Sequence, residues 1–202
     1  FSDDNTKSII EKINDKKIIF IERDKKLGLG SAHKLSIIYS IQNNYDFLIS
    51  MDADFSHDPK YIPELIKKSG KQKFVIGSRF CKGGKLDYKI IRKFVSYFGN
   101  KFATFMLNIP IKEVTTFYRV YDIELLKKIP LNKLKADGYS MGVELVWYMK
   151  KLGAEMHEVP IHFKDRNKGK SKLPKNQILI SVFDLFKLKL IDIFNINIFK
   201  ND

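Results

Sequence analysis

The chain has 202 residues, 44% of them apolar and 30% charged, and its 37 Lys and Arg against 23 Asp and Glu give a formal net charge of +14. This length and apolar content suit one domain with a sizeable core and exclude a wholly disordered protein, while the single cysteine excludes an intrachain disulfide framework and a cysteine-based zinc site. The basic excess indicates a negatively charged partner, which is nucleic acid, an anionic membrane or a phosphorylated substrate, or it is in part a solvated lysine-rich surface.

Strands and helices alternate through the first part of the chain. The apolar, β-branched run Lys17–Ile21 predicts a buried strand. The elements predicted after it are a helix over 31–43, a buried strand over 46–51, a helix opened by Pro59 and a strand over 74–76. This order is typical of a parallel α/β sheet.

The second part adds longer helices. The predicted elements are a helix over 90–107, a strand over 117–121, a helix over 141–152, an alternating segment over 155–163, a basic loop and a last helix over 178–194. The sequence has no internal repeat and no long linker. We therefore expect a single domain.

Two carboxylates follow the predicted strand at 46–51. Alternation along an extended segment points Asp52 and Asp54 the same way, and ligands of open parallel sheets bind where the strands end. Hard oxygen ligands suit Mg²⁺ or Mn²⁺, which also take substrate phosphates. A second interpretation stays open on these residues alone, namely a pair of capping acids ahead of Pro59.

Around these acids the chain resembles the family 2 glycosyltransferases, and more narrowly the polyprenyl-phosphate (dolichol-phosphate) mannosyltransferases. Met51–Pro59 resembles the metal-binding signature of that family, and four further segments match in order. They are Gly28-Leu29-Gly30-Ser31-Ala32, Gly77-Ser78-Arg79-Phe80 with Gly83-Gly84, the R-x3-S-x3-N spacing of Arg92, Ser96 and Asn100, and Asp165–Lys172. The resemblance runs from Asp3 to Pro174, nearly the whole chain.

The resemblance implies both a fold and a reaction. The implied fold is α/β, a GT-A-like (Rossmann-like), mostly parallel sheet flanked by helices in one domain. The implied reaction moves a hexose, mannose from GDP-mannose, to a polyprenyl (dolichyl) phosphate with inversion and with Mg²⁺ or Mn²⁺. The nearer alternative is a family 2 enzyme that uses a UDP-sugar, such as a polyprenyl-phosphate glucosyltransferase.

An alternative of another class is a basic nucleic-acid-binding module. Against it stand the acidic motif at a strand end and the absence of interleaved aromatic residues from the basic loop. We therefore expect a nucleoside diphosphate sugar, a polyprenyl phosphate and a membrane surface as partners, and no nucleic acid.

The resemblance also implies the site residues. Asp54 and Arg79 are the expected catalytic residues. The donor-binding residues are expected to be Asp3, Asp4, Gly28, Gly30, Asp52, Ala53 and Asp54, the acceptor-phosphate-binding residues Arg79, Arg92, Ser96, Arg166 and Lys172, and the metal ligands Asp52, Asp54 and Ser56.

Taken alone, these residue types allow simpler interpretations. The glycine turn at 28–30 offers a helix N-terminus to a diphosphate, or is an ordinary turn with Ser31 as N-cap. Arg79 has the planar fork that suits phosphate, or forms a salt bridge to a surface carboxylate. Arg92 and Ser96 share one helix face, which clamps a phosphate or faces solvent.

The chain departs from the family pattern in two places. Where the family shows D-x-T-S-G-F-R, this chain has Glu113–Arg119, with Phe117 in place of the glycine, so the backbone there cannot use a glycine-only conformation cheaply. The family's first strand and its Pro-x-Tyr-Asn-Glu motif have no counterpart before Ser2–Thr6, so we expect a catalytic domain truncated at its N-terminus. We expect His57 to be structural.

The last predicted helix has one strongly apolar side. The residues on that side are Leu179, Val182, Phe183, Phe186, Leu190, Ile193 and Phe194. Charges interrupt every window long enough to span a bilayer, so the helix is expected to lie on a bilayer surface or to pack on the sheet.

These features define two regions. We expect a catalytic domain over 1–175 and an amphipathic helix and tail over 176–202, held peripherally at the cytoplasmic face of a membrane. The basic loop 164–175 is expected to close over phosphates as a lid.

Overall fold

The computed structural model describes residues 5–23, 25, 27–134, 140–164 and 177–199. The helices are α1 (Thr6–Glu11), α2 (Gly28–Gln42), η1 (Pro59–Tyr61), α3 (Ile62–Lys68), α4 (Ile90–Met106), α5 (Ile123–Leu126), α6 (Ser140–Lys151) and α7 (Gln177–Ile193). The strands are β1 (Phe47–Ser50), β2 (Lys73–Ser78), β3 (Lys85–Asp87), β4 (Arg119–Asp122), β5 (Glu155–Pro160) and β6 (His162–Lys164). The helices predicted from apolar spacing all form, and α1, α5 and β3 were not predicted.

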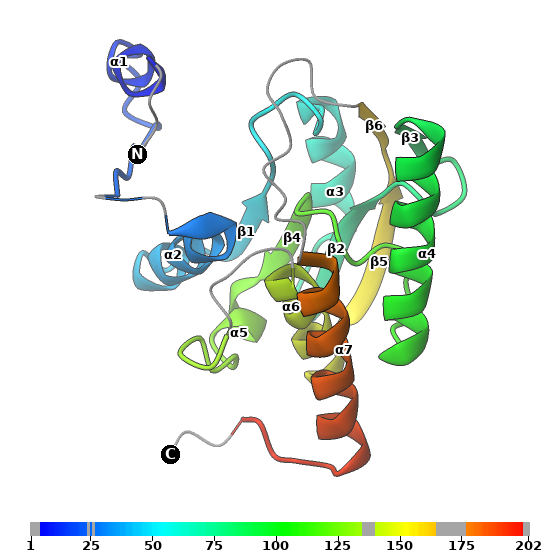
Figure 1. The fold of residues 1–202 in the computed structure, drawn as a ribbon. Coiled ribbons are helices and arrows are strands. Elements are labelled where there is room, and N and C mark those ends of the chain that lie inside the picture. The colour runs from blue at the N-terminus through cyan, green and yellow to red at the C-terminus, as the bar shows by residue number, and fades with distance from the viewer. Residues whose placement is uncertain (1–4, 24, 26, 135–139, 165–176, 200–202) are drawn as a thin grey trace.

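Four strands form the central sheet in the order β1-β4-β2-β5 (Figure 1). β2 and β5 are parallel, whereas β4 runs antiparallel to its two neighbours, β1 and β2. Three strands therefore run in one direction, as expected for this α/β fold, and β4 makes the sheet mixed. Because β4 is reversed, its first residue lies beside the last residues of β1 and β2, with Arg119 opposite Ser50 and Ile76. The carboxyl ends of β1, β2 and β5 thus share one edge with the loop that enters β4.

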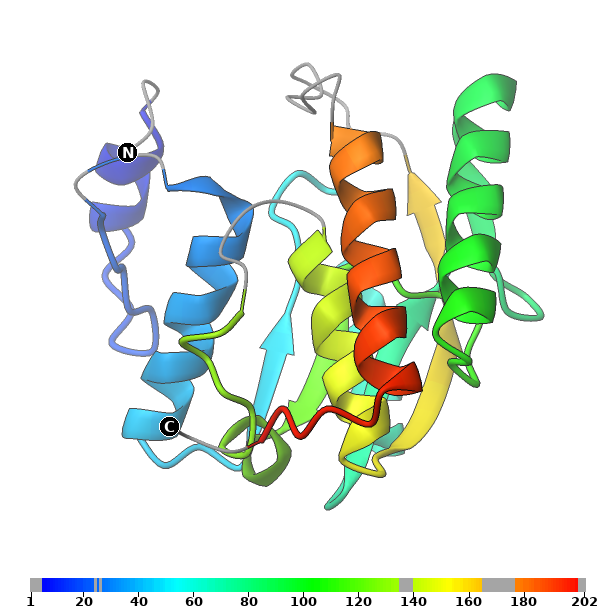
Figure 2. The same cartoon turned by 60° about the horizontal axis from the view of Figure 1, so that its bottom comes forward.

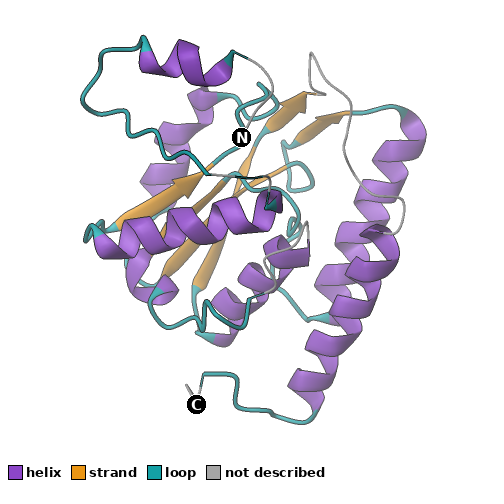
Figure 3. Cartoon of the chain, turned by 60° about the vertical axis from the view of Figure 1, so that its left-hand side comes forward, coloured by secondary structure: helices purple, strands orange, loops and turns teal. Residues whose placement is uncertain are grey.

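Successive residues of β2 feed two cores on opposite faces of the sheet, as a pleated strand requires. Phe74 and Ile76 pack with α2, α6 and α7, whereas Val75 packs with Leu65 of α3. Figure 2 shows α2, α6 and α7 in front of the sheet, and Figure 3 shows helices on both sides of the strands. A second, two-stranded sheet pairs β3 with β6, and it carries the chain from β2 to α4.

The prediction of a buried strand at Lys17–Ile21 is wrong. The segment forms no strand, and its four apolar side chains, Ile18 to Ile21, are 41–56% exposed. A strand is stable when a neighbour satisfies its amides and carbonyls, and within the described residues β1 pairs with β4 alone. β1 is accordingly an edge strand, with Phe47 40% exposed, rather than the fully buried strand that its composition indicated.

Two long helices, α4 and α7, pack side by side (Figure 2), and each has polar as well as apolar side chains buried. On α7, Asp184 is buried and Asp192 accepts a hydrogen bond from the Trp147 indole (3.2 Å). The predicted apolar side of α7 is instead largely exposed, with Leu179 74% and Phe183 69% exposed. The helix does pack on the core that covers the sheet, as the alternative expected, but through Leu185 and Leu188 rather than through the predicted apolar side.

The exposed side of α4 is equally apolar. Its exposed apolar side chains are Ile90, Ile91, Phe94, Val95, Phe98, Phe102 and Phe105, and Lys93, Tyr97 and Lys101 are exposed as well. Phe102 meets Phe186 of α7 with ring centroids 6.4 Å apart, so the two apolar sides join. Among the residues that the structure describes, no helix is long and apolar enough to cross a bilayer.

Candidate active site at the carboxyl edge of the sheet

The acidic motif forms a tight loop directly after β1. Asp54 accepts hydrogen bonds from the Ser56 amide (3.1 Å) and from the Ser56 hydroxyl. Phe55, between them, adopts a left-handed backbone (φ 63°) and is 78% exposed. Ser56 is buried, so it fixes the Asp54 carboxylate at the edge of the sheet, while the Asp52 side chain remains 35% exposed. The loop therefore presents two carboxylates at the edge, with Ala53 exposed between them.

The buried side chain of His57 holds this loop in place. Its Nδ1 accepts the Asp52 amide hydrogen (2.8 Å), so in the neutral ring Nε2 carries the proton and donates to Thr116 Oγ1 (2.9 Å). Burial, followed by the nearby Arg79, lowers the pKa of His57 to about 4. The imidazole is neutral at pH 7 with both nitrogens engaged, which supports the structural role expected from the sequence and leaves no nitrogen for a metal.

Arg79, at the end of β2, lies in a buried ion pair. Its Nε and Nη2 donate to the two carboxylate oxygens of Glu113, at 2.7 and 2.9 Å. Burial opposes ionisation of Glu113, but Arg79 and the Thr115 amide together hold the Glu113 pKa below its usual range. Arg79 does pair with a carboxylate, but that carboxylate is fully buried and not on the surface. The pair fixes two of the three guanidinium nitrogens.

Thr115 connects this pair to α4. Its hydroxyl donates to Glu113 (2.9 Å) and accepts from Arg79 Nη2 (2.7 Å) and Asn100 Nδ2 (3.0 Å), which uses its one proton and both lone pairs. Asn100 also accepts the Val114 amide hydrogen (2.9 Å). The R-x3-S-x3-N stripe thus lies on the inward side of α4, with Arg92 and Ser96 half-buried above Asn100.

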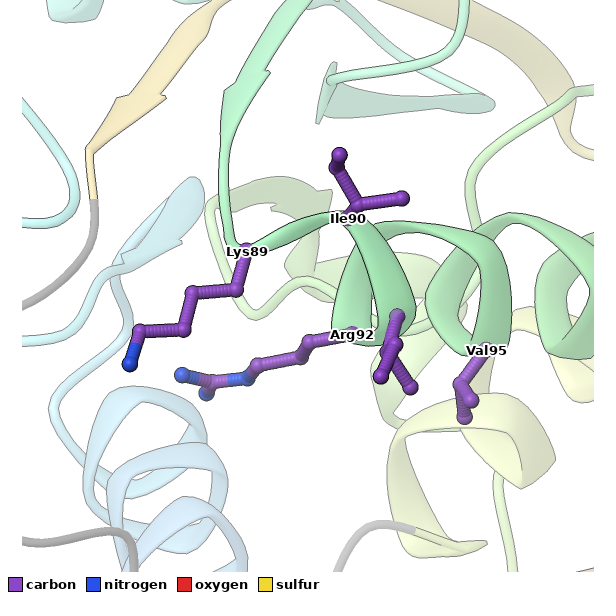
Figure 4. Close-up of a pocket in the computed structure, with 5 residues that line it drawn as sticks. Lys89, Ile90, Arg92 and Val95 are labelled. Carbon is purple, nitrogen blue, oxygen red and sulfur yellow. The ribbon is translucent and has the colours of Figure 1, made fainter.

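Arg92 lies at the start of α4 beside another basic side chain. Its guanidinium carbon is 3.9 Å from the centroid of the Tyr88 ring, a cation–π arrangement. Figure 4 shows the Lys89 and Arg92 side chains extending in the same direction, away from Val95. Arg92 is thus partly buried, with its guanidinium on the ring of Tyr88.

One buried aromatic ring, Phe163 of β6, links these separate segments. Its centroid is 5.2 Å from that of His57 and 5.7 Å from that of Tyr88, and the Arg79 guanidinium carbon is 5.2 Å from it. The acidic loop after β1, the arginine after β2 and the platform under Arg92 therefore surround one side chain. The spacing of the sequence motifs does not predict this contact, because Phe163 belongs to none of them.

The glycine turn forms the first turn of α2. Gly28 has φ 81°, a conformation that favours glycine, and Gly30 is buried. The helix begins at Gly28 with Leu27 as N-cap, so Ser31 is not the N-cap and its hydroxyl donates to the Gly28 carbonyl (2.8 Å). His33, three residues after Gly30 on α2, holds these glycines at the same edge of the sheet.

His33 stacks on Phe117 with ring centroids 3.9 Å apart. The guanidinium carbon of Arg119, the first residue of β4, lies 4.8 Å from the centroid of the same Phe117 ring. Burial and the charge of Arg119 lower the pKa of His33 to about 4. Phe117 is not among the non-glycine residues with positive φ. The backbone at this position therefore does not require glycine, and the phenyl ring fills the space between the two basic side chains.

Four of the predicted site residues, Asp3, Asp4, Arg166 and Lys172, lie outside the described residues, as does most of the basic loop 164–175. Tyr88, Thr115 and Phe163 were not predicted as site residues. For Tyr88 a signal exists, since it precedes Arg92 by four residues and so lies near it on one side of the helix start. Glu113 was noted for its departure from the family pattern, but not as the partner of Arg79.

Comparison with known proteins agrees with the motifs. A family model described as glycosyl transferase family 2 matches residues 1–130. The undecaprenyl-phosphate mannosyltransferase of Micrococcus luteus is 34% identical over 160 residues, which are 79% of this chain and 66% of that protein. The polyprenol monophosphomannose synthase of Mycolicibacterium smegmatis is 32% identical over 165 residues, 81% of this chain and 62% of that protein. The chain thus spans less than two thirds of the length of these relatives.

Proposed function

The chain belongs to glycosyl transferase family 2, and from that premise we propose that it transfers mannose from GDP-mannose to a polyprenyl phosphate. The observation that carries the proposal is the grouping of the Asp52–Asp54 loop, Arg79 and Arg92 around Phe163 at one edge of the sheet. An acidic loop suits a metal-bound diphosphate, and a pair of arginines suits a phosphate monoester. The names of the two relatives give the same pair of substrates, a mannosyl group and a polyprenyl phosphate.

The proposed reaction is a single displacement with inversion. A phosphate oxygen of the acceptor bonds to the anomeric carbon, and the bond from that carbon to the nucleoside diphosphate breaks. A phosphate monoester loses its second proton near pH 6, so the nucleophile is already ionised at pH 7 and no strong general base is required. The protein must hold two anions in line and stabilise the departing diphosphate.

Individual residues take defined parts in this step. Arg92 and Ser96, adjacent on the inward side of α4, bind the acceptor phosphate. Arg79 is held by Glu113 through Nε and Nη2, so it addresses the acceptor through its remaining nitrogen, Nη1. The net charge of the Arg79–Glu113 pair is zero, and Arg79 therefore contributes direction more than charge.

The acidic loop fits a divalent metal of the Mg²⁺ or Mn²⁺ type. Such ions take one or two carboxylates and complete their shell with water and substrate phosphate, which matches the half-exposed Asp52 and the Asp54 carboxylate aligned by Ser56. Within the described ranges no group of three or more His, Cys, Asp and Glu forms a dedicated metal cage. We propose Asp52 and Asp54 as ligands, with Ser56 beside them. When bound, the metal would neutralise charge on the leaving diphosphate.

The proposed site of action is a membrane surface, because the acceptor is a lipid. The joined apolar sides of α4 and α7 face outward next to the stripe that holds Arg92 and Ser96. Lys89 and Lys93 at the start of α4 add positive charge that anionic lipids attract. This arrangement would bring the phosphate of a membrane-embedded polyprenol to Arg92 without lifting its chain into water.

The test is transfer of radiolabelled sugar from a panel of GDP-mannose, UDP-glucose and UDP-galactose to farnesyl phosphate, by the protein expressed from its complete reading frame. Label in the lipid phase from GDP-mannose, dependent on Mg²⁺ or Mn²⁺, is the expected result. Transfer from a UDP-sugar alone would replace the donor and keep the reaction class. Binding to arbitrary duplex DNA that falls steeply with salt, without any transfer, would contradict the proposal and favour a nucleic-acid-binding role.

A further inference from the structure

The position of Arg92 depends on a neighbour outside every sequence motif. An arginine side chain has four rotatable bonds and loses rotamer freedom when it binds a phosphate. Stacking on the Tyr88 ring at 3.9 Å fixes the plane of the Arg92 guanidinium before any ligand arrives. A guanidinium stacked by its face keeps its N–H edge directed sideways, where a phosphate can be bound through two parallel hydrogen bonds.

Tyr88 is itself held in place. It lies between β3 and α4 and is half-buried, and its ring meets Phe163 edge-on at 5.7 Å with an interplanar angle of 80°. The Arg79 guanidinium carbon lies 5.2 Å from the same Phe163 ring. The platform under Arg92 and the arginine of the buried ion pair therefore share one rigid aromatic support.

Tyr88 also influences the charge of Arg79. Burial alone would lower the pKa of Arg79, but Glu113 and then the Tyr88 hydroxyl, through charge and hydrogen bonding, raise it. One tyrosine thus stacks on Arg92 by its ring and also acts on the charge of Arg79.

We propose that Tyr88 is the positioning residue of a two-arginine clamp for the acceptor phosphate monoester, setting the separation and orientation of Arg79 and Arg92. The proposal rests on the proposed function for the identity of the acceptor. It assigns to Tyr88 no contact with the transferred sugar and no step in proton transfer. Its prediction is specific: changes at Tyr88 alter the use of the acceptor and spare the donor.

The experiment compares Tyr88→Phe, Tyr88→Leu, Arg92→Lys and the double variant Tyr88→Leu/Arg92→Lys. Tyr39→Leu is the matched control, since Tyr39 is another half-buried tyrosine and packs on Tyr45, before the start of β1 and away from the carboxyl edge. Two readouts are needed: KM for farnesyl phosphate and for the sugar donor in the transfer assay, and binding of farnesyl phosphate and farnesol without donor by calorimetry. Urea unfolding midpoints confirm that each variant folds.

We expect Tyr88→Leu to raise KM for farnesyl phosphate about ten-fold, the scale of a partly desolvated cation–π contact, with the donor KM within about two-fold. Tyr88→Phe keeps the platform and should lose less. In the Arg92→Lys background, Tyr88→Leu should raise the acceptor KM less than it does alone, because one of the two arginines that it positions is gone. Full additivity, an equal rise in donor KM, or an unchanged acceptor KM in a folded variant would overturn the inference.

Two results separate this inference from the proposed function. If the wild-type protein binds farnesyl phosphate no more tightly than farnesol, no phosphate clamp exists and the role of Tyr88 is refuted. If it binds farnesyl phosphate tightly, loses that binding on Tyr88→Leu, and transfers no sugar from any donor, the clamp stands and the proposed reaction falls. Should Tyr88→Leu fail to fold, Tyr88→Phe together with the Arg92→Lys cycle still decides between additivity and its absence.

Discussion

Arg79 and Glu113 form a two-pronged ion pair in the interior, with nitrogen–oxygen distances of 2.7 and 2.9 Å. Arg79 is 8% exposed and Glu113 is fully buried. Glu113 also accepts hydrogen bonds from the amide and the hydroxyl of Thr115. A buried pair of this kind contributes little net stability against an apolar alternative, but removing one partner strands a charge. The pair is therefore best understood as a device that orients one arginine.

Glu113→Gln should lower the free energy of unfolding by about 3 kcal/mol, because the Arg79 charge remains buried without its counter-charge. Glu113→Asp keeps the charge on a shorter arm and should lose less. Urea denaturation followed by far-ultraviolet circular dichroism measures both changes. Glu124→Gln is the control, since Glu124 pairs with Lys127 on the surface, and its midpoint should stay at the wild-type value. A Glu113→Gln midpoint equal to that of the control would mean that the pair is not buried in solution.

We expect the free energy of unfolding to fall in mild acid because of two buried histidines. His57 and His33 have pKa values of about 4 in the fold, below the ordinary 6.5. Between pH 6.5 and 4 the unfolded chain therefore binds more protons than the folded one. Stability is complete above pH 6.5 and decreases as the pH falls through this window, by about 3 kcal/mol for each histidine.

The variant that tests this assignment is His57→Gln, whose amide can still accept from Asp52 and donate to Thr116. It should flatten the dependence of the unfolding free energy on pH by about half of the two-histidine total. His162→Gln is the control, because His162 is partly exposed and paired with Asp87. A pH dependence that is the same in His57→Gln and wild type would show that His57 titrates normally.

Two glycines make a matched pair of tests. A Cβ at Gly84 would lie 2.6 Å from the Ser78 carbonyl oxygen and 2.7 Å from backbone atoms of Arg79, whereas a Cβ at Gly99 would meet nothing within 4 Å. Gly84→Ala should therefore push the β2 terminus and Arg79 out of position, costing about 2 kcal/mol or more by the usual scale of overpacking. Gly99→Ala, inside α4, should be neutral or stabilising by up to about 1 kcal/mol. Thermal unfolding of the two variants decides, and equal losses would contradict the close approach at Gly84.

The local elements of this fold were predictable, and its long-range contacts were not. Apolar spacing predicted α2, α4, α6 and α7, since a helix is specified by residues three and four apart. The strand at Lys17–Ile21 failed because pairing depends on a neighbour that composition does not reveal. The Arg79–Glu113 pair joins residues 34 positions apart along the chain, and the reversed β4 pairs Asp122 with Phe47 of β1. No periodicity encodes such partners.

The two long helices show a second limit of sequence patterns. The pattern of α7 correctly separated an apolar side from a polar side, but it did not tell which one faces the protein. The side that faces the protein carries both Asp184 and the apolar Leu185 and Leu188, and Asp192 contacts Trp147 and Lys151 there. The site motifs show the same limit. The spacing of Arg92 and Ser96 predicted a shared face, while the stacking of Arg92 on Tyr88 was not predicted, although the two residues are four positions apart.

Asp54→Asn should reduce sugar transfer by at least about 100-fold, the scale of lost electrostatic stabilisation at a leaving group, while leaving the fold intact. The amide keeps the size and the hydrogen bonds to Ser56 but removes the charge that would hold a metal. Asp58→Asn is the matched control, because Asp58 caps η1 four residues later and accepts from Lys60. Transfer at wild-type rate by Asp54→Asn, or undiminished in excess chelator, would refute the metal assignment.

The last prediction concerns membrane binding by the exposed apolar side of α7. Leu179 and Phe183 are 74% and 69% exposed, so replacing them by glutamate should not disturb the core that Leu185 and Leu188 join. An apolar side chain that enters a bilayer contributes about 1.5–3 kcal/mol. Leu179→Glu/Phe183→Glu should therefore weaken binding to anionic liposomes by about 100-fold or more in a sedimentation assay. The loss should persist at high salt, where attraction of the basic residues is screened.

The control for this experiment carries the same change of charge at a distant place. Ile9 and Ile13, at and after α1, are 59% and 49% exposed, and α1 lies away from α4 and α7 (Figure 1). Ile9→Glu/Ile13→Glu should weaken the charge-dependent part of liposome binding slightly and keep the salt-resistant part. Transfer to farnesyl phosphate in detergent should survive in both double variants, because neither touches the carboxyl edge of the sheet. If the α7 variant still sediments with liposomes at high salt as the wild type does, the membrane contacts the protein elsewhere, and the outward apolar sides of α4 and α7 need another partner.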